Sequence, residues 1–221
     1  MKKLVAILLL FLPWRLRRIA LNKIFRYQIH PTARIGLSLI CPVRLEMDAG
    51  ARIGNLTLCK GISLLKMSEK SSIGNLNWIT GFPENDHSFF GADVGRKPEL
   101  ILGPQSAVTT RHFIDCTNSI RIGKFTTFAG AHSQMLTHSI DLYECRQSSK
   151  PITIGEYCFV GTGCVLLGGS SLPDYSVLGA NSVLNKHHAD PYFLYAGNPA
   201  RPIKQLPREM AYFNRLTGFV H

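Results

Sequence analysis

The stretch 154–189 divides into six consecutive six-residue units: Ile154-Gly-Glu-Tyr-Cys-Phe, Val160-Gly-Thr-Gly-Cys-Val, Leu166-Leu-Gly-Gly-Ser-Ser, Leu172-Pro-Asp-Tyr-Ser-Val, Leu178-Gly-Ala-Asn-Ser-Val and Leu184-Asn-Lys-His-His-Ala. An aliphatic residue opens every unit, and a small residue fills the fifth place of five of them. The apolar spacing of three and four that an amphipathic helix needs is absent. The fixed period predicts a solenoid, and a period of six predicts a parallel β-helix with coils of about eighteen residues.

These units resemble the repeats of the hexapeptide-repeat acyltransferases, and the resemblance covers roughly Ile29 to Leu206. It implies an all-β fold, a left-handed parallel β-helix, whose handedness the period itself does not reveal. Weaker sixfold spacing precedes the perfect units, with slips near 65 and 120. Its predicted inward residues are Ile29, Ile35, Cys41, Met47, Ile53, Cys59, Met67, Ile73, Ile79, Leu102, Val108, Ile114, Phe128 and Gln134.

Two stretches interrupt the period and predict loops that leave the solenoid, at 83–98 and 140–150. The first contains Phe89 and Phe90 and favours a lid or a subunit contact over a plain linker. The chain is therefore divided into an N-terminal segment at 1–26, a β-helix domain at 27–206 and a C-terminal tail at 207–221, for which a short helix is expected.

The composition suits one globular domain with a sizeable core: 221 residues, 45% of them hydrophobic, with 19 Gly. The six cysteines show no metal-ligand spacing such as C-x2-C. Cys158 and Cys164 occupy small-residue positions of the repeat, which predicts buried, inert thiols without disulfides in a reducing compartment.

The net charge of +11 is concentrated at the N-terminus, where residues 1–26 contain seven Lys and Arg and the first acidic residue is Glu46. A basic nucleic-acid groove is therefore not indicated. The apolar run from Leu4 to Leu12 spans only about 14 Å as a helix, less than half of the hydrocarbon core. Three interpretations stay open: a membrane-surface anchor at the inner face of the cytoplasmic membrane, which we favour, a signal peptide, or a helix that caps the solenoid.

The segment Leu136-Thr-His-Ser-Ile-Asp141 resembles the catalytic histidine segment of sugar and polysaccharide O-acetyltransferases. The resemblance implies that His138 is a general base. A sugar hydroxyl is a poor nucleophile until its proton is accepted, and imidazole titrates near neutral pH. If the count from Phe128 is kept, His132 and His138 both fall at inward positions, so we infer a register slip or a turn before His138.

Three further polar residues are candidates for the same site. His112 lies one coil before His132, and in the sugar acetyltransferases a polar residue near this place helps to hold the acceptor, which implies a substrate-site role. Asp115 or Asp141 would orient an imidazole. The alternative for each acid is an ordinary solvated turn.

For coenzyme A, the resemblance implies contacts around Thr162, Ala180, Lys186, Arg201 and Lys204. Small residues would let a pantetheine arm lie along the coils, and cations would meet the phosphates. The string Ala196-Gly-Asn-Pro-Ala-Arg-Pro-Ile-Lys resembles a terminal signature of these enzymes. The resemblance also implies acetyl-CoA as co-substrate, no metal, and a homotrimer with sites between subunits.

The sequence thus predicts an acyl-CoA-dependent O-acyltransferase that acetylates a sugar hydroxyl of a polysaccharide or a lipid-linked saccharide by direct transfer. Two alternatives remain. His112, His132 and His138 could hold zinc as in the γ-type carbonic anhydrases, which share the fold. The solenoid could also be a non-catalytic, membrane-tethered module.

Overall fold

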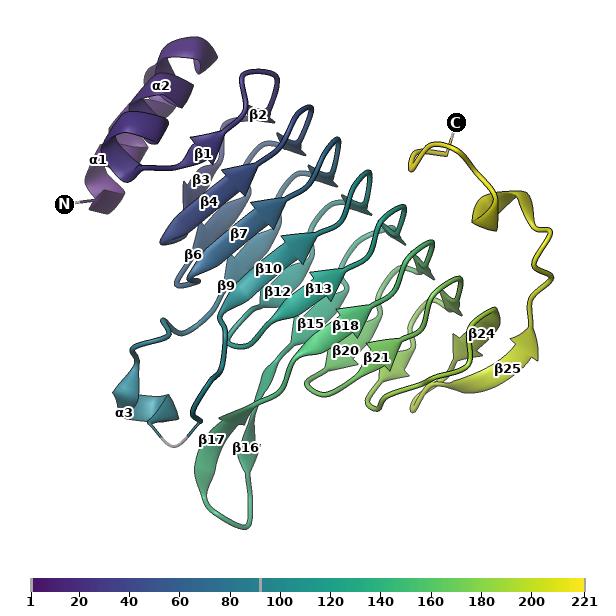
Figure 1. Cartoon of the computed structure of the whole chain (residues 1–221). Coiled ribbons are helices and arrows are strands. Elements are labelled where there is room, and N and C mark those ends of the chain that lie inside the picture. Colours follow the sequence, from purple (N-terminus) through teal and green to yellow (C-terminus); the bar gives the residue numbers. More distant parts are fainter. Residues whose placement is uncertain (1, 92, 221) are drawn as a thin grey trace.

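A computed structural model describes residues 2–91 and 93–220. Met1 and His221, at the ends of the predicted N-terminal segment and tail, and Ala92 in the first predicted loop lie outside the described residues. Helices α1 (Lys2–Leu8), η1 (Leu9–Phe11) and α2 (Trp14–Phe25) pack across one end of a long solenoid of strands (Figure 1).

Three parallel sheets form the three faces of the solenoid. The first contains β1 (Gln28–Ile29), β4 (Arg44–Met47), β7 (Leu64–Met67), β10 (Glu99–Leu102), β13 (Ile120–Ile122), β18 (Ile152–Ile154) and β21 (Ser171–Leu172). The second contains β2 (Arg34–Ile35), β5 (Arg52–Ile53), β8 (Ser72–Ile73), β11 (Ala107–Val108), β14 (Thr127–Phe128), β19 (Phe159–Val160), β22 (Val177–Leu178), β24 (Phe193–Ala196) and an antiparallel last strand, β25 (Arg201–Gln205). The third contains β3 (Leu39–Cys41), β6 (Leu58–Lys60), β9 (Trp78–Thr80), β12 (Phe113–Asp115), β15 (Gln134–Leu136), β20 (Val165–Leu167) and β23 (Val183–Leu184).

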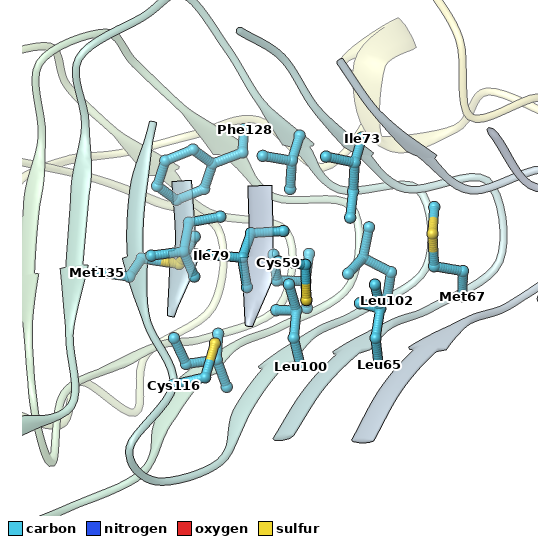
Figure 2. Packing of buried hydrophobic residues seen from close by; sticks show 14 of the residues in the cluster. Cys59, Leu65, Met67, Ile73, Ile79, Leu100, Leu102, Cys116, Phe128 and Met135 are labelled. Carbon is cyan, nitrogen blue, oxygen red and sulfur yellow. The ribbon is translucent and has the colours of Figure 1, made fainter. Parts of the chain in front are cut away.

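The perfect repeats have the predicted register. Ile154 pairs with Leu172 and Val160 with Leu178, each eighteen residues on, so three units close one coil. The opening aliphatic residue and the fifth residue of each unit are buried throughout this stretch. Equivalent side chains of successive coils stack inside the solenoid, and Figure 2 shows this for the middle coils. The predicted fold, a left-handed parallel β-helix, is confirmed.

Two inward positions differ from the prediction by one residue. Ile40 is buried in place of Cys41, and Met135 is buried in place of Gln134, which is exposed. The second shift follows a turn in which Gly130 and His132 have φ of 70° and 61°. This turn adds one residue to the coil, so that His138 moves off the inward position. The slip inferred from the sequence is therefore present.

The two interruptions of the period project from the same edge of the solenoid (Figure 1). The first carries α3 (His87–Phe90), a single helical turn whose N-terminus is capped by the Asp86 carboxylate. The second is an antiparallel hairpin of β16 (His138–Asp141) and β17 (Arg146–Ser149). Both loops leave the solenoid between a strand of the third sheet and the next strand of the first sheet.

The N-terminal helices cap the open end of the first coil. The buried Arg17 guanidinium donates hydrogen bonds to the carbonyl oxygens of Gly36 and Ser38, both at 2.7 Å, and Trp14 donates to Ala33 O at 3.0 Å. Leu21 is buried against the core. Of the three interpretations of this segment, the capping contact is present in the structure. In the parts of the chain that the structure describes, every helix is too short or too polar to cross a bilayer.

The C-terminal tail contains one 3-10 turn, η2 (Ala211–Phe213), in place of the short helix expected. It runs back along the solenoid (Figure 1). Tyr212 donates to the carbonyl of Cys158 at 2.9 Å, and Gly218 N donates to the Gln105 side chain at 2.9 Å. These contacts hold the tail against earlier coils.

Candidate active site

The candidate site is built around His138, the first residue of the projecting hairpin. Its side chain is 35% exposed, and its Nδ1 lies 2.7 Å from Oδ2 of Asp115, whose side chain is only 2% exposed. Asp115 ends β12, which pairs with β15 in the next coil. The stacking of successive coils therefore brings together two residues that lie 23 positions apart in the sequence.

The Asp115 carboxylate is held from several directions. Oδ1 accepts hydrogen bonds from the hydroxyl of Thr117 at 2.6 Å and from its backbone N–H at 3.2 Å. Oδ2 accepts from the backbone N–H groups of Thr137 and His138 at 3.0 and 3.1 Å. Burial alone would raise the pKa of Asp115, but the hydrogen bonds from His138 and Thr117 outweigh it, and the pKa is lowered. Asp115 is therefore a fixed anion.

The Asp115 carboxylate determines the pKa and the tautomer of the His138 ring. The hydrogen bond to Asp115 raises the pKa of His138 above its ordinary value, although partial burial opposes the shift. Because an ionised carboxylate can only accept, Nδ1 carries the proton that is donated to Asp115. In the neutral ring, Nε2 is then the atom that can accept a proton. A histidine with this tautomer and orientation has the arrangement of a general base.

The first loop covers the ring. The rings of Phe82 and Phe90 lie edge-on to His138, with centroids 5.8 and 6.1 Å away. The buried Arg96 guanidinium holds this cover: it donates to the carbonyls of Phe82 and Thr117 and lies 4.7 Å from the Phe90 ring centroid. Phe90 is buried, whereas Phe89 is exposed. Both loops therefore meet at His138.

A polar contact joins the loop to the hairpin. The Asp93 carboxylate accepts a hydrogen bond of 2.5 Å from Ser149, which pairs with His138 across the hairpin. Asn118 donates to the same Ser149 hydroxyl at 3.0 Å. The cover and the hairpin are thus held as one unit around the imidazole.

Two grooves meet at His138, on opposite sides along the third sheet. One, of about 410 Å³, extends over earlier coils and is lined by Lys60, Gly61, Thr80, Gly81, Phe82, Pro83, Phe113 and Asp115 as well as His138. The other, of about 530 Å³, extends over later coils and is lined by Leu136, Thr137, Ser139, Ser148, Ser149, Lys150, Leu167, Gly168 and Asn185 as well as His138. His138 lines both grooves.

His112 does not reach this site. It is 2% exposed, inside the coil, where its Nδ1 accepts from Ser133 N at 3.2 Å and its Nε2 lies 3.0 Å from the Thr109 hydroxyl. Burial, together with the charge of His132, lowers the pKa of His112 to about 4. The expected substrate contact of His112 is therefore corrected: its ring is a neutral, hydrogen-bonded part of the core.

Asp141 and His132 are also separate from the imidazole of His138. The Asp141 carboxylate accepts from the backbone N–H groups of Tyr143 and Glu144 and so caps the hairpin turn. It lies three residues along the strand from His138, a rise of about 10 Å. His132 occupies an exposed turn. The partner that orients His138 is therefore Asp115 and not Asp141.

The residues predicted to bind coenzyme A lie elsewhere on the solenoid. Thr162 and Ala180 occupy stacked turns between the second and third sheets, whereas His138 lies where the third sheet turns into the first. Arg201 and Lys204 are exposed on β25, and Lys186 is exposed just after β23. Lys186 follows Asn185, which lines the larger groove. Within a single chain, the five residues predicted to bind coenzyme A therefore do not all lie near His138.

Sequence reasoning missed the residues that cover and line the site. Phe82, Arg96 and Lys60 belong to no repeat position, so the period assigns them no role. A signal was available for Arg96, a basic residue within a loop that also carries aromatic residues. Its burial, however, is a tertiary property that sequence spacing does not encode.

The three histidines required by the carbonic anhydrase alternative are held apart. His112 is in the core, His132 is in an exposed turn, and His138 is bonded to Asp115. Within 2–91 and 93–220, the described side chains form no group of three or more His, Cys, Asp or Glu that could hold a metal ion. Burial also raises the pKa of Cys158 to about 12, so this thiol is not poised as a nucleophile.

Comparison with known proteins supports the fold. No protein-family model matches the chain. A protein from Schizosaccharomyces pombe, named a putative acetyltransferase, is 34% identical over 77 residues, which are 33% of this chain and 36% of that protein. The chain thus matches about a third of the length of this curated relative.

Two solved structures resemble the chain over most of its length. The polysialic acid O-acetyltransferase OatWY matches with a TM-score of 0.62 and 16% identity, over 81% of this chain and 84% of its own. The polysialic acid-specific acetyltransferase NeuO matches with a TM-score of 0.50 and 16% identity, over 81% of each chain. The chain is a β-helix built from six-residue repeats, and it shares this fold with the two acetyltransferases.

Proposed function

We propose that the protein is an acyl-CoA-dependent O-acyltransferase that transfers an acetyl group to a hydroxyl of a polysaccharide or lipid-linked saccharide. The observation that carries this proposal is the His138–Asp115 pair, which lies where two grooves meet. A direct transfer needs a base between two substrates, and this pair provides one. The names of the two fold relatives and of the S. pombe relative support the choice of reaction.

In the proposed reaction, Nε2 of His138 accepts the proton of the sugar hydroxyl while the hydroxyl oxygen attacks the thioester carbonyl of acetyl-CoA. The tetrahedral intermediate collapses as the carbon–sulfur bond breaks. Coenzyme A then leaves and takes up the proton from the imidazolium. Asp115 fixes the tautomer and stabilises the imidazolium that forms, as the acid of a catalytic triad does. No acyl-enzyme is needed.

The grooves suggest separate places for the two substrates. The groove over later coils contains Gly168 and leads past Asn185 towards Lys186, which suits a pantetheine arm that ends in phosphates. The groove over earlier coils contains Phe113, Phe82 and Lys60, which suits a saccharide that packs on aromatic rings. We assign the first to acetyl-CoA and the second to the acceptor.

The proposal includes a homotrimer. Thr162, Ala180 and Arg201 lie away from the edge that carries His138. In a ring of three chains, the edge of a neighbouring copy could face His138 and bring these residues to the same bound acetyl-CoA. Cyclic symmetry would then give three equivalent sites.

The test is release of free thiol from acetyl-CoA by the wild-type protein with a panel of saccharide and lipid-linked saccharide acceptors, with mass spectrometry of the products. The proposal predicts thiol release that depends on an acceptor and yields an acetylated saccharide. The absence of coenzyme A binding by calorimetry, together with the absence of acceptor-dependent release, would contradict it.

A further inference from the structure

The N-terminal helices expose a continuous series of large apolar side chains that face away from the solenoid. In α1 and η1 the exposed positions 4, 7, 8 and 11 follow helical spacing, and positions 12, 16 and 19 continue the series into α2. Phe11 is 83% exposed, Leu4 64% and Leu8 61%. We call this surface the N-terminal apolar stripe; it consists of Leu4, Ile7, Leu8, Phe11, Leu12, Leu16 and Ile19.

The stripe is not needed to attach the helices. Ala6, Leu9 and Leu21 are buried on the opposite side, towards the first coil. The hydrogen bonds of Arg17 and Trp14 fix α2 to that coil. The stripe is therefore a second apolar face that remains after the cap is complete, and apolar surface of this kind marks an interaction site.

The basic side chains around the N-terminal apolar stripe indicate an anionic partner. The exposed side chains of Arg15, Lys23 and Arg26 lie on or next to α2. The sequence contains no acidic residue before Glu46, so the segment carries basic charge without compensation. Apolar side chains flanked by cations fit an anionic lipid surface, where the apolar groups enter the acyl boundary and the cations stay among the headgroups.

We propose that the N-terminal apolar stripe docks the protein onto the surface of an anionic bilayer, with α1 and α2 lying in the interface. The bound form does not span the bilayer. It is a helical pair already folded against the solenoid, so docking requires no unfolding of the cap. Helices α1 and α2 lie at the end of the solenoid opposite β24 and β25 and away from the hairpin of β16 and β17 (Figure 1).

The experiment is co-sedimentation of the full chain with vesicles of phosphatidylcholine alone or mixed with phosphatidylglycerol, at low and high salt. We compare wild type with Leu8→Ser/Phe11→Ser/Leu12→Ser. The control is Val43→Ser/Leu56→Ser/Leu142→Ser, which changes three exposed apolar side chains outside the N-terminal helices. Thermal melting of each variant checks that the fold is intact.

We expect wild type and the control to bind the anionic vesicles and to bind them less at high salt. The stripe variant should partition at least about tenfold more weakly, because three anchoring side chains are lost. Arg15→Gln/Lys23→Gln/Arg26→Gln should weaken binding to anionic vesicles and reduce its salt dependence. With a soluble acceptor, turnover should stay at the wild-type level in both variants.

Two results would overturn the proposal. One is equal, weak partitioning of wild type and the stripe variant to both kinds of vesicle. The other is a lower oligomer mass of the folded stripe variant without lipid, because it would identify the stripe as an interface between copies of the chain. Both readouts are independent of catalysis, so loss of the proposed acyltransferase function would leave this test intact.

Discussion

At the scale of single residues, the candidate site depends on one hydrogen bond, between Nδ1 of His138 and Oδ2 of Asp115. Asp115 raises the pKa of His138, and a general base works only when it is deprotonated. Turnover at subsaturating substrate should therefore be low at acid pH and rise as the pH passes through this raised pKa.

We predict that Asp115→Asn shifts this rise to lower pH, because removal of the negative charge lowers the pKa of His138. The variant should also lose at least about 100-fold in kcat/KM, since the tautomer and orientation of the ring are no longer fixed. A pH profile of kcat/KM measures both effects. Asp141→Asn is the matched control, and a pH profile of Asp115→Asn that coincides with that of wild type would refute the role of Asp115.

The sequence identified His138 by its motif but could not choose between Asp115 and Asp141 as its partner. Asp141 is nearer along the chain, yet it caps the hairpin turn. Asp115 becomes the neighbour only because β12 and β15 stack in successive coils. Motifs report residue types, whereas this pairing depends on the register of the coils.

A second prediction concerns His112, whose pKa burial lowers to about 4. In the folded protein the His112 ring stays neutral, whereas in the unfolded chain the ring accepts a proton at the ordinary histidine pKa near 6.5. Stability should therefore fall as the pH decreases from about 6.5 to about 4. Melting temperatures across this range should fall less steeply for His112→Gln, although it is less stable than wild type at pH 7. Parallel pH profiles for the two proteins would contradict this account.

At the scale of elements, the loop at 83–98 and the hairpin of β16 and β17 are the features that the repeat does not specify. The sixfold period stops at both places, so the amino-acid sequence predicts both interruptions. The period does not predict that the two loops meet at His138, because this depends on Arg96 binding backbone carbonyls and on Asp93 contacting Ser149. Such contacts are made by side chains that follow no period.

The third prediction tests the cover. Arg96→Ala leaves the carbonyls of Phe82 and Thr117 without this donor and removes the contact with the Phe90 ring. Limited proteolysis should cut the loop at 83–98 faster, and kcat/KM should fall because water enters around His138. Lys97→Ala, at an exposed neighbouring position, is the control. Equal cleavage rates in the two variants would show that Arg96 does not hold the loop.

At the scale of the whole molecule, the sequence predicted the solenoid because each coil repeats the same inward pattern, and stacking then follows from burial. The ends are less predictable, since an end coil lacks one neighbour and must be covered by something outside the repeat. Here α2 covers the first coil, and it uses a buried arginine where an apolar residue would be expected. The tail that follows the last coil binds earlier coils through hydrogen bonds and through the buried ring of Phe213.

The fourth prediction concerns this cap. Arg17→Ala leaves the carbonyl of Ser38 without its Arg17 donor, whereas the carbonyl of Gly36 keeps the hydrogen bond from Ser38 N. The free energy of unfolding should therefore fall by about 1–3 kcal/mol, the cost of one unsatisfied buried group. Arg15→Ala, on the exposed face of α2, should change it by less than about 0.5 kcal/mol. Denaturant unfolding measures both. Equal stabilities of the two variants would show that the cap contributes little.

The most direct test of the central claim is the rate of acetyl transfer from acetyl-CoA to the identified acceptor, measured for wild type, His138→Ala and the control His132→Asn. His132 lies in an exposed turn with positive φ, which Asn tolerates. We predict a loss of at least about 100-fold for His138→Ala, with melting and coenzyme A binding unchanged, and wild-type activity for His132→Asn. A His138→Ala protein that transfers acetyl groups at the wild-type rate would contradict the assignment of His138 as the base.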